Sequence, residues 1–226
     1  MPPSAASPER PAPSQLLVRV QRGLEQLYRV ASAVTIADFV VDERRRDELA
    51  PTRRPREQLL VRQGEDEVAL GVFIDANVLH NLERHDPGAQ LTHHNFGDFL
   101  LALEGVSHFV YTVFCADRAR AVSALELELQ AEVDKYVTCL LMGDPQDRGV
   151  SAKLRHRLFA DPCYEPDLDE DERRRYQVAN DNARRYAAYL EAEFVYERRV
   201  PQLLAEVRRF YRRPLAAKLE DIARAA

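Results

Sequence analysis

The sequence predicts a mainly α protein, a helical bundle with a small N-terminal β-hairpin. Three observations favour this fold class. Apolar residues recur every three to four positions through most of the chain, as on the buried face of an amphipathic helix. Only one region, about 57–75, has two β-rich runs separated by a polar turn. With 226 residues, of which 46% are hydrophobic and 31% charged, the chain can bury a hydrophobic core without disulfides or structural metal ions.

The chain begins with a segment that predicts no folded structure. Residues 1–14 are rich in Pro, Ala and Ser and lack the apolar stretch of a signal peptide. We therefore expect a disordered tail, followed by a single helical domain over 15–226. Its first helix is predicted from Gln15 to about Val34 by apolar spacing, and an Arg- and Pro-rich connection follows.

The hairpin is expected to consist of strands Glu57–Gln63 and Val68–Asp75. Both runs carry β-branched and apolar residues, and the turn between them, 64–67, contains a glycine. Asp75 is placed to cap a short helix that ends at His85, before an Asp-Pro-Gly turn.

Two long helices form the predicted centre of the bundle. The first covers about 94–116 and the second Ser123–Met142, where Ser123 and Glu126 form a capping-box pattern. About six residues connect them, which favours adjacent antiparallel helices. Ser151 is then expected to cap a shorter helix that ends at Phe159.

The last third, from Asp169 to Ala226, is predicted to be helical. Breaks are expected at Pro201 and Pro214, because proline tends to start a new helix. Arginine pairs recur here with interleaved tyrosines, an arrangement that can bind phosphates and stack on bases. Acidic residues are equally dense in the same segment, so we interpret it as a solvated, salt-bridged surface on which nucleic-acid binding is unlikely.

Composition and motifs exclude several classes of protein. The formal net charge of -5 gives no general attraction to nucleic acid or to anionic membranes. No phosphate-binding glycine motif, HExxH or GxSxG sequence is present. The three cysteines, Cys115, Cys139 and Cys163, are isolated, which favours a reducing compartment and hence a cytoplasmic protein.

One stretch, 96–116, is apolar enough to suggest a membrane span. It contains Asp98, Glu104 and His108, and a carboxylate at the centre of a spanning helix costs roughly 3 kcal/mol. A buried helix of a soluble protein is therefore the prediction, with no membrane as partner.

The best candidate for chemistry is a stripe on the first long helix. Glu104, His108 and Tyr111 follow one another at spacings of four and three, so they are neighbours on one side of the helix. A carboxylate beside an imidazole raises the histidine pKa and fixes its tautomer, which suits a general base or a metal ligand. The alternative is an exposed or half-buried Glu–His pair, with a tyrosine beside it, that has no function. These three residues are the predicted catalytic group.

The second long helix adds two carboxylates to this hypothesis. Glu128 and Glu132 share one line beside its apolar face, so Glu104, His108, Glu128 and Glu132 are the predicted metal ligands if the protein is an enzyme. Such a pair of helices resembles ferritin-like di-iron carboxylate bundles, which implies a di-metal site between helices. That family uses Glu-x-x-His, whereas no Glu-x-x-His occurs in this chain.

A second resemblance lies in residues 72–79, Val-Phe-Ile-Asp-Ala-Asn-Val-Leu. This segment is similar to the opening strand of PIN-domain nucleases and would imply that Asp75 is a metal ligand. The chain shows no second apolar strand that ends in an acidic residue, as such a nuclease needs.

Three functions stay open on the sequence. The first is a non-enzymatic protein with a regulatory or scaffolding role, which acts through contacts with a protein partner and can form a homo-oligomer. The second is a metal- or acid/base-dependent enzyme with a Glu/His site inside the bundle. The third is a nucleic-acid-binding module that uses the C-terminal arginines. No particular cofactor, substrate or partner is indicated.

Overall fold

The structure is a computed structural model that describes residues 15–50, 54–63, 68–145, 147–162 and 168–225. The predicted fold class is confirmed, because 68% of the chain is helical and one small antiparallel sheet lies near the N-terminus. The predicted tail, 1–14, and hairpin turn, 64–67, lie outside the described residues.

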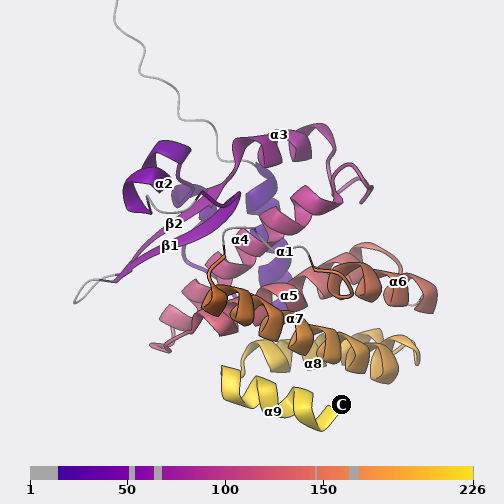
Figure 1. The fold of residues 1–226 in the computed structure, drawn as a ribbon. Helices are drawn as coiled ribbons and strands as arrows, with labels where there is room; N and C mark the ends of the chain where they lie inside the picture. Colours follow the sequence, from indigo (N-terminus) through magenta and orange to yellow (C-terminus); the bar gives the residue numbers. More distant parts are fainter. Residues whose placement is uncertain (1–14, 51–53, 64–67, 146, 163–167, 226) are drawn as a thin grey trace, which may run out of the picture.

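Figure 1 shows the order of the elements along the chain. The hairpin comprises β1 (Glu57–Gln63) and β2 (Val68–Ile74). A single turn of 3-10 helix covers Ile36–Asp38, and a short π-helical turn covers Glu191–Val195. The α-helices are α1 (Gln15–Tyr28), α2 (Glu43–Leu49), α3 (Ala76–Arg84), α4 (Phe96–Ala116), α5 (Ala124–Met142), α6 (Arg148–Phe159), α7 (Glu170–Leu190), α8 (Val200–Tyr211) and α9 (Leu215–Ala225).

Helices α4 and α5 form the predicted antiparallel pair at the centre. The hydrogen bonds between them show the antiparallel order. Ser107 of α4 pairs with Asp134 of α5, and the later Tyr111 pairs with the earlier Glu126. By length and composition α4 is the one helix in the described residues that is able to span a membrane. Most of it is buried inside the protein, against α1, α3, α5 and the hairpin.

The hairpin covers one side of α4. Its strands pair antiparallel, with Glu57 opposite Ile74, as predicted from the two β-rich runs. A close approach to α4 is possible at Gly105, where an added Cβ would lie 3.0 Å from Cγ of Glu57. The glycine therefore allows β1 to bring the Glu57 side chain against the helix.

The C-terminal helices lie on the other side of the central pair (Figure 1), where α7 packs on α5, α9 packs on α7, and α8 packs on α1. Helix α7 begins with a complete capping box, in which Asp169 and Glu172 each accept a backbone N–H. The predicted breaks are confirmed: Pro201 lies in the first turn of α8, and α9 follows Pro214.

Two helix boundaries differ from the predictions. Helix α1 ends at Tyr28, because Arg29 adopts the left-handed conformation with φ of 51°. Helix α6 begins at Arg148, because Asp147 caps it by accepting the N–H groups of Gly149 and Val150. The predicted cap, Ser151, instead lies inside the helix.

The hydroxyl of Ser151 has a buried partner that explains its position. It donates to Oε1 of Glu191, a side chain that is 2% exposed, and lies 2.8 Å from the hydroxyl of Tyr136. A buried carboxylate requires such donors. In addition, α2 occupies part of the connection for which no helix was predicted.

Candidate functional site

A cavity of about 940 Å³ lies between β1, the α4–α5 pair and the adjoining parts of α6 and α7. Its rim includes Val61, which is 54% exposed, and its interior includes the nearly buried His108. The cavity is large enough for an organic ligand, since typical small-molecule sites enclose roughly 300 to 1,000 Å³.

Four predicted site residues line this cavity together. Glu104 and His108 come from α4, and Glu128 and Glu132 come from α5. Helical spacing explains each pair, because residues four apart lie one above the other on the same face. The antiparallel packing of the two helices then brings both pairs to one place. A fifth side chain, that of Glu57 on β1, joins them across Gly105 and is 9% exposed.

His108 lies between two carboxylates. Its Nδ1 is 3.6 Å from Oε1 of Glu57, and its Nε2 is 3.5 Å from Oε2 of Glu128. These separations exceed those of good hydrogen bonds, which are about 2.7 to 3.2 Å. Consequently Nε2 of His108 and Oε1 of Glu57 are buried without a hydrogen-bond partner. Such buried atoms are rare in folded proteins and point to a missing ligand or to strain.

The other two carboxylates share a lysine. Nζ of Lys135 is 2.7 Å from Oε2 of Glu104 and 2.7 Å from Oε1 of Glu132. No hydrogen bond joins Glu104 to His108, although their ligand atoms and that of Glu128 lie within 4.8 Å of one another. The Glu104 partner is therefore Lys135 rather than the histidine expected from the helical stripe.

Burial and mutual charge shift the pKa values of the cluster in opposite directions. Burial raises the pKa of Glu57 and Glu132, and the neighbouring carboxylates add to the effect. Burial also opposes ionisation of Glu104, but the positive charges of Lys135 and His108 outweigh it and lower the pKa. For His108, the proximity of Glu128 and Glu57 outweighs burial and raises the pKa well above its usual range. The cluster thus favours the charged forms of Glu104 and His108 and disfavours those of Glu57 and Glu132.

Two side chains of α7 complete this side of the cavity. Nε of Arg175 lies 3.9 Å from Oε1 of Glu128, and this Nε is buried without a hydrogen bond. Burial and the charges of Glu128, Glu104 and Glu57 raise the pKa of Tyr176, so its hydroxyl stays protonated beside them. The hydroxyl of Tyr176 therefore adds no negative charge to this side of the cavity.

The cluster has the composition of a metal site. Glu104, His108 and Glu128 each offer one ligand atom in a buried or half-buried position. Two ligands bound to one divalent ion lie roughly 3 to 4.5 Å apart, given metal–ligand distances of about 2.0 to 2.3 Å. Small rotations of these side chains would therefore close the set around an ion. Carboxylate and imidazole donors suit zinc, iron and manganese.

Tyr111, the third residue of the predicted catalytic stripe, lies in a different cluster and does not line the cavity. Its hydroxyl donates to Oε1 of Glu126 and accepts from Nζ of Lys218, each at 2.7 Å. Lys218, on α9, is fully buried and also donates to Gln130. Glu126 thus binds Tyr111 rather than completing the capping box, where only the Ser123 bond is present.

The same second cluster continues to Asp134. This buried carboxylate accepts hydrogen bonds from Tyr28, Ser107 and Gln130. Burial raises the pKa of Asp134 to about 6 despite these donors. The cluster links α1, α4, α5 and α9, and most of its polar atoms have partners.

Sequence reasoning left Glu57, Lys135 and Lys218 out of the predicted site residues, although the spacing of Glu132 and Lys135 does predict their contact. The position of Glu57 depends on how the hairpin packs, which no local pattern indicates. The two lysines carry a usable signal, because this arginine-rich chain has only three lysines, the third being Lys153. Two of the three are buried in ion-pair or hydrogen-bond clusters.

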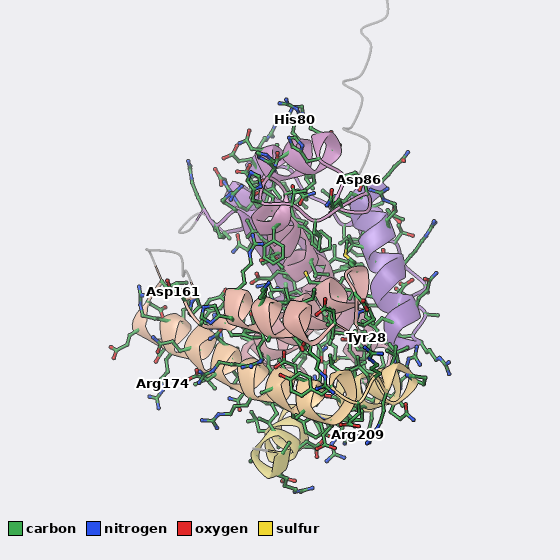
Figure 2. The ribbon with its side chains drawn as sticks, turned by 90° about the vertical axis from the view of Figure 1, so that its right-hand side faces the viewer. Tyr28, His80, Asp86, Asp161, Arg174 and Arg209 are labelled. Carbon is green, nitrogen blue, oxygen red and sulfur yellow. The ribbon has the colours of Figure 1, made fainter. Side chains whose placement is uncertain are left out.

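The remaining residues singled out in the sequence lie elsewhere. Asp75, the acid of the nuclease-like segment, accepts from the N–H of Asn77 as a helix cap and does not line the cavity. Figure 2 shows His80 at the top of the molecule, away from Asp161 on the left, and Asp161 does line the cavity. The five histidines outside the cavity are all exposed: His80, His85, His93, His94 and His156.

Several C-terminal arginines are engaged within the protein. Arg209 and Arg213 both pair with Asp221, at 2.8 and 2.9 Å. Arg212 donates to the backbone oxygen of Tyr28 at 2.8 Å. Their positive charge is thus partly used in holding α8 and α9 in place.

Comparisons of the chain with protein-family models, with curated proteins and with solved structures find no match. The inferences about function therefore rest on the geometry and chemistry of the cavity.

Proposed function

We propose that the protein is a metal-dependent enzyme whose divalent ion is held by Glu104, His108 and Glu128 in the cavity between β1, α4, α5 and α7. The observation that carries this proposal is the buried imidazole with an unpartnered Nε2, within 4.8 Å of two carboxylates and beside a large cavity. A structural ion-pair cluster would be expected to satisfy its buried atoms.

Charge supports a cation at this position. Four carboxylates meet in the cluster, and the cations among them are Lys135 and a protonated His108, with Arg175 at a longer distance. Burial is the main cause of the raised pKa values of Glu57 and Glu132, and the neighbouring carboxylates add to it because the cluster holds an excess of negative charge. A divalent ion would neutralise it and would replace the proton on Nε2 of His108.

A divalent ion bound here would supply Lewis-acid activation of a water molecule or of a substrate oxygen. Glu57 lies at the His108 Nδ1 side and is placed to orient the imidazole and to accept a proton. Lys135 holds Glu104 and Glu132 in position.

This proposal ranks the enzyme above the interaction protein favoured by the sequence alone. Contacts with a protein partner require no buried, charged cavity, whereas catalysis does. A protein partner and self-association remain compatible with the enzyme.

The test is metal binding by the purified protein and two cavity variants. We expect calorimetric titration with Mn²⁺ or Zn²⁺ to give one site per chain in the wild type. His108→Gln and Glu128→Gln should each weaken binding by roughly 100-fold or more. The matched control is His80→Gln, an exposed histidine outside the cavity (Figure 2), which should leave affinity unchanged.

Spectroscopy separates a specific site from loss of fold. In the wild type, Co²⁺ should give an absorption spectrum that includes a nitrogen ligand, and this spectrum should change in His108→Gln. Urea unfolding of the metal-free proteins reports whether the variants still fold. A wild type that binds no divalent ion, or a folded His108→Gln protein that binds as tightly as the wild type, would refute the proposal.

A further inference from the structure

The cavity is much larger than a metal ion requires. Its volume of about 940 Å³ lies near the upper end of the range for organic ligands. One part of its wall is apolar and comes from the hairpin and from the adjoining faces of α4 and α5. The residues of this apolar wall are Leu59, Val61, Leu101, Val122 and Leu127. A ligand with an apolar body can therefore be accommodated beside the charged cluster.

Arg157, on α6, provides a positive charge at the cavity that no described carboxylate neutralises. Its guanidinium carbon lies 3.6 Å from the centre of the Phe96 ring, and both residues line the cavity. Stacking on the ring holds the planar guanidinium in place. Within the described residues, no acidic side chain lies within 4.0 Å of its nitrogens. Its donors are therefore available to a ligand.

Arg175, on α7, provides a second guanidinium with loosely bound donors. Its ion pairs with Glu128 and Glu172 are both 3.9 Å long, which is beyond hydrogen-bonding distance. Its buried Nε makes no hydrogen bond. Because Arg175 adjoins Glu128, a group that binds the proposed metal ion also lies within reach of this arginine.

We infer that the substrate of this cavity is a small organic anion, a carboxylate or a phosphate ester with an apolar body. The anionic group binds Arg175, beside Glu128, through the planar fork of the guanidinium, which matches both kinds of anion. Arg157 supplies a second positive charge at the Phe96 end of the same cavity. The apolar body lies along the wall formed by Leu59 and Val61. That this anion is a substrate rests on the proposed function. Binding of the anion, however, can be measured independently of catalysis.

The metal ion should strengthen this binding. In its absence, the carboxylates of the cluster repel an anion, and Arg157 and Arg175 oppose that repulsion only in part. A bound divalent ion removes the repulsion, so metal and anion should each raise the affinity of the other by the same factor.

The experiment uses four simple aromatic probes. Phenyl phosphate and benzoate represent the two kinds of anion, benzylamine is the cationic control and benzyl alcohol the neutral control. Each is titrated into the full-length protein by calorimetry, with and without saturating Mn²⁺, while binding of Mn²⁺ itself is measured separately. We expect the anions to bind more tightly than both controls, and more tightly still with Mn²⁺. The stronger of the two anions identifies the chemistry of the substrate.

Substitutions then assign the binding to the two arginines. Arg175→Gln should weaken anion binding by roughly tenfold or more, as expected for loss of a charge-assisted hydrogen bond. Arg157→Gln should weaken it by a smaller factor, because it removes a more distant positive charge of the same cavity. Arg175→Lys, which keeps the charge without the planar fork, should give an intermediate loss. The matched control is Arg174→Gln, an exposed arginine on the same helix that does not line the cavity (Figure 2).

The outcomes separate this inference from the proposed function. If the protein binds Mn²⁺ but the anions bind no better than benzylamine, or bind equally to the arginine variants, the inference is wrong and the metal site stands. If Mn²⁺ fails to bind while anions bind through Arg157 and Arg175, the anion site stands and the metal-dependent function fails.

Discussion

Lys218 should make the stability of the protein depend on pH in a defined window. Its side chain is fully buried, and burial lowers its pKa from 10.5 to about 7 against the opposing charges of Glu126 and Asp134. Its Nζ donates to the neutral acceptors Tyr111 and Gln130, so the uncharged amine is also well bonded.

The direction of the effect follows from proton binding. Between about pH 7 and pH 10.5 the unfolded chain binds a proton at Lys218 that the folded protein does not, so the free energy of unfolding rises with pH. One proton corresponds to about 1.4 kcal/mol per pH unit, which gives about 2 kcal/mol between pH 7 and pH 8.5. Below about pH 7 both states are protonated, and this contribution is constant.

Urea unfolding at several pH values measures this contribution when the wild type is compared with Lys218→Met. The wild type should gain about 2 kcal/mol relative to the variant between pH 7 and pH 8.5. Lys153→Met, a substitution at an exposed lysine, should follow the wild type. The upper limit avoids the range in which Cys115 titrates differently in the two states, because burial raises its pKa to about 11.

A direct measurement is also possible, since only three lysines contribute to the spectrum of protein labelled with ¹³C at Cε. The Lys218 signal should titrate near neutral pH, whereas Lys135, whose pKa is raised by Glu104 and Glu132 against the effect of burial, should stay charged. A Lys218 signal that titrates near pH 10.5, or parallel stability curves for wild type and Lys218→Met, would refute the reasoning.

Two further substitutions test the two polar clusters separately. Gly105→Ala adds a Cβ at 3.0 Å from Cγ and Oε1 of Glu57, so it should displace that side chain and weaken Mn²⁺ binding. The change in its free energy of unfolding should stay within about 1 kcal/mol, because alanine favours the helix by a similar amount; unchanged Mn²⁺ affinity would show that Glu57 does not support the site. Tyr28→Phe removes a buried donor to Asp134 and should destabilise the protein by about 1 to 3 kcal/mol in urea, whereas wild-type stability would contradict a net contribution from this bond.

Local patterns were sufficient to predict most of the helices. The apolar spacing of α4 and α5 and the short connection between them predicted an antiparallel pair, and the structure confirms it. The cap of α6 was assigned to the wrong residue, because Ser151 and Asp147 are both good N-caps and the local sequence does not distinguish them. The Ser151 hydroxyl is instead used as a buried donor to Glu191, 40 positions further along the chain, and only the fold brings these two residues together.

For the candidate site, the sequence predicted which residues share a helix face but not which partners they contact. Helical spacing correctly places Glu104, His108 and Tyr111 on one side of α4, but it does not identify what each of them faces. Seven residues separate Glu104 from Tyr111, which is about 10 Å along the helix axis. Over that distance the partner changes, so that Glu104 meets Lys135 and Tyr111 meets Glu126. Neighbours on other elements, which only the fold supplies, decide the role of each residue.

The two polar clusters differ in whether their buried charged groups are satisfied by hydrogen bonds within the protein. Asp134 and Lys135 are adjacent on α5 and belong to different clusters, one closed and one beside the cavity. In the closed cluster, Asp134 has three donors, and Lys218 is bonded to Tyr111 and Gln130. Such a cluster can hold helices together without a ligand.

The cluster beside the cavity has the opposite character. It combines an excess of carboxylates with a buried His108 Nε2 and an Arg175 Nε that lack partners. Buried polar atoms without partners cost free energy, which a protein tolerates where a ligand later supplies the missing bonds. Under the proposed function, the same helix pair contributes one cluster to stability and the other to binding, and the difference lies in which buried atoms remain unsatisfied.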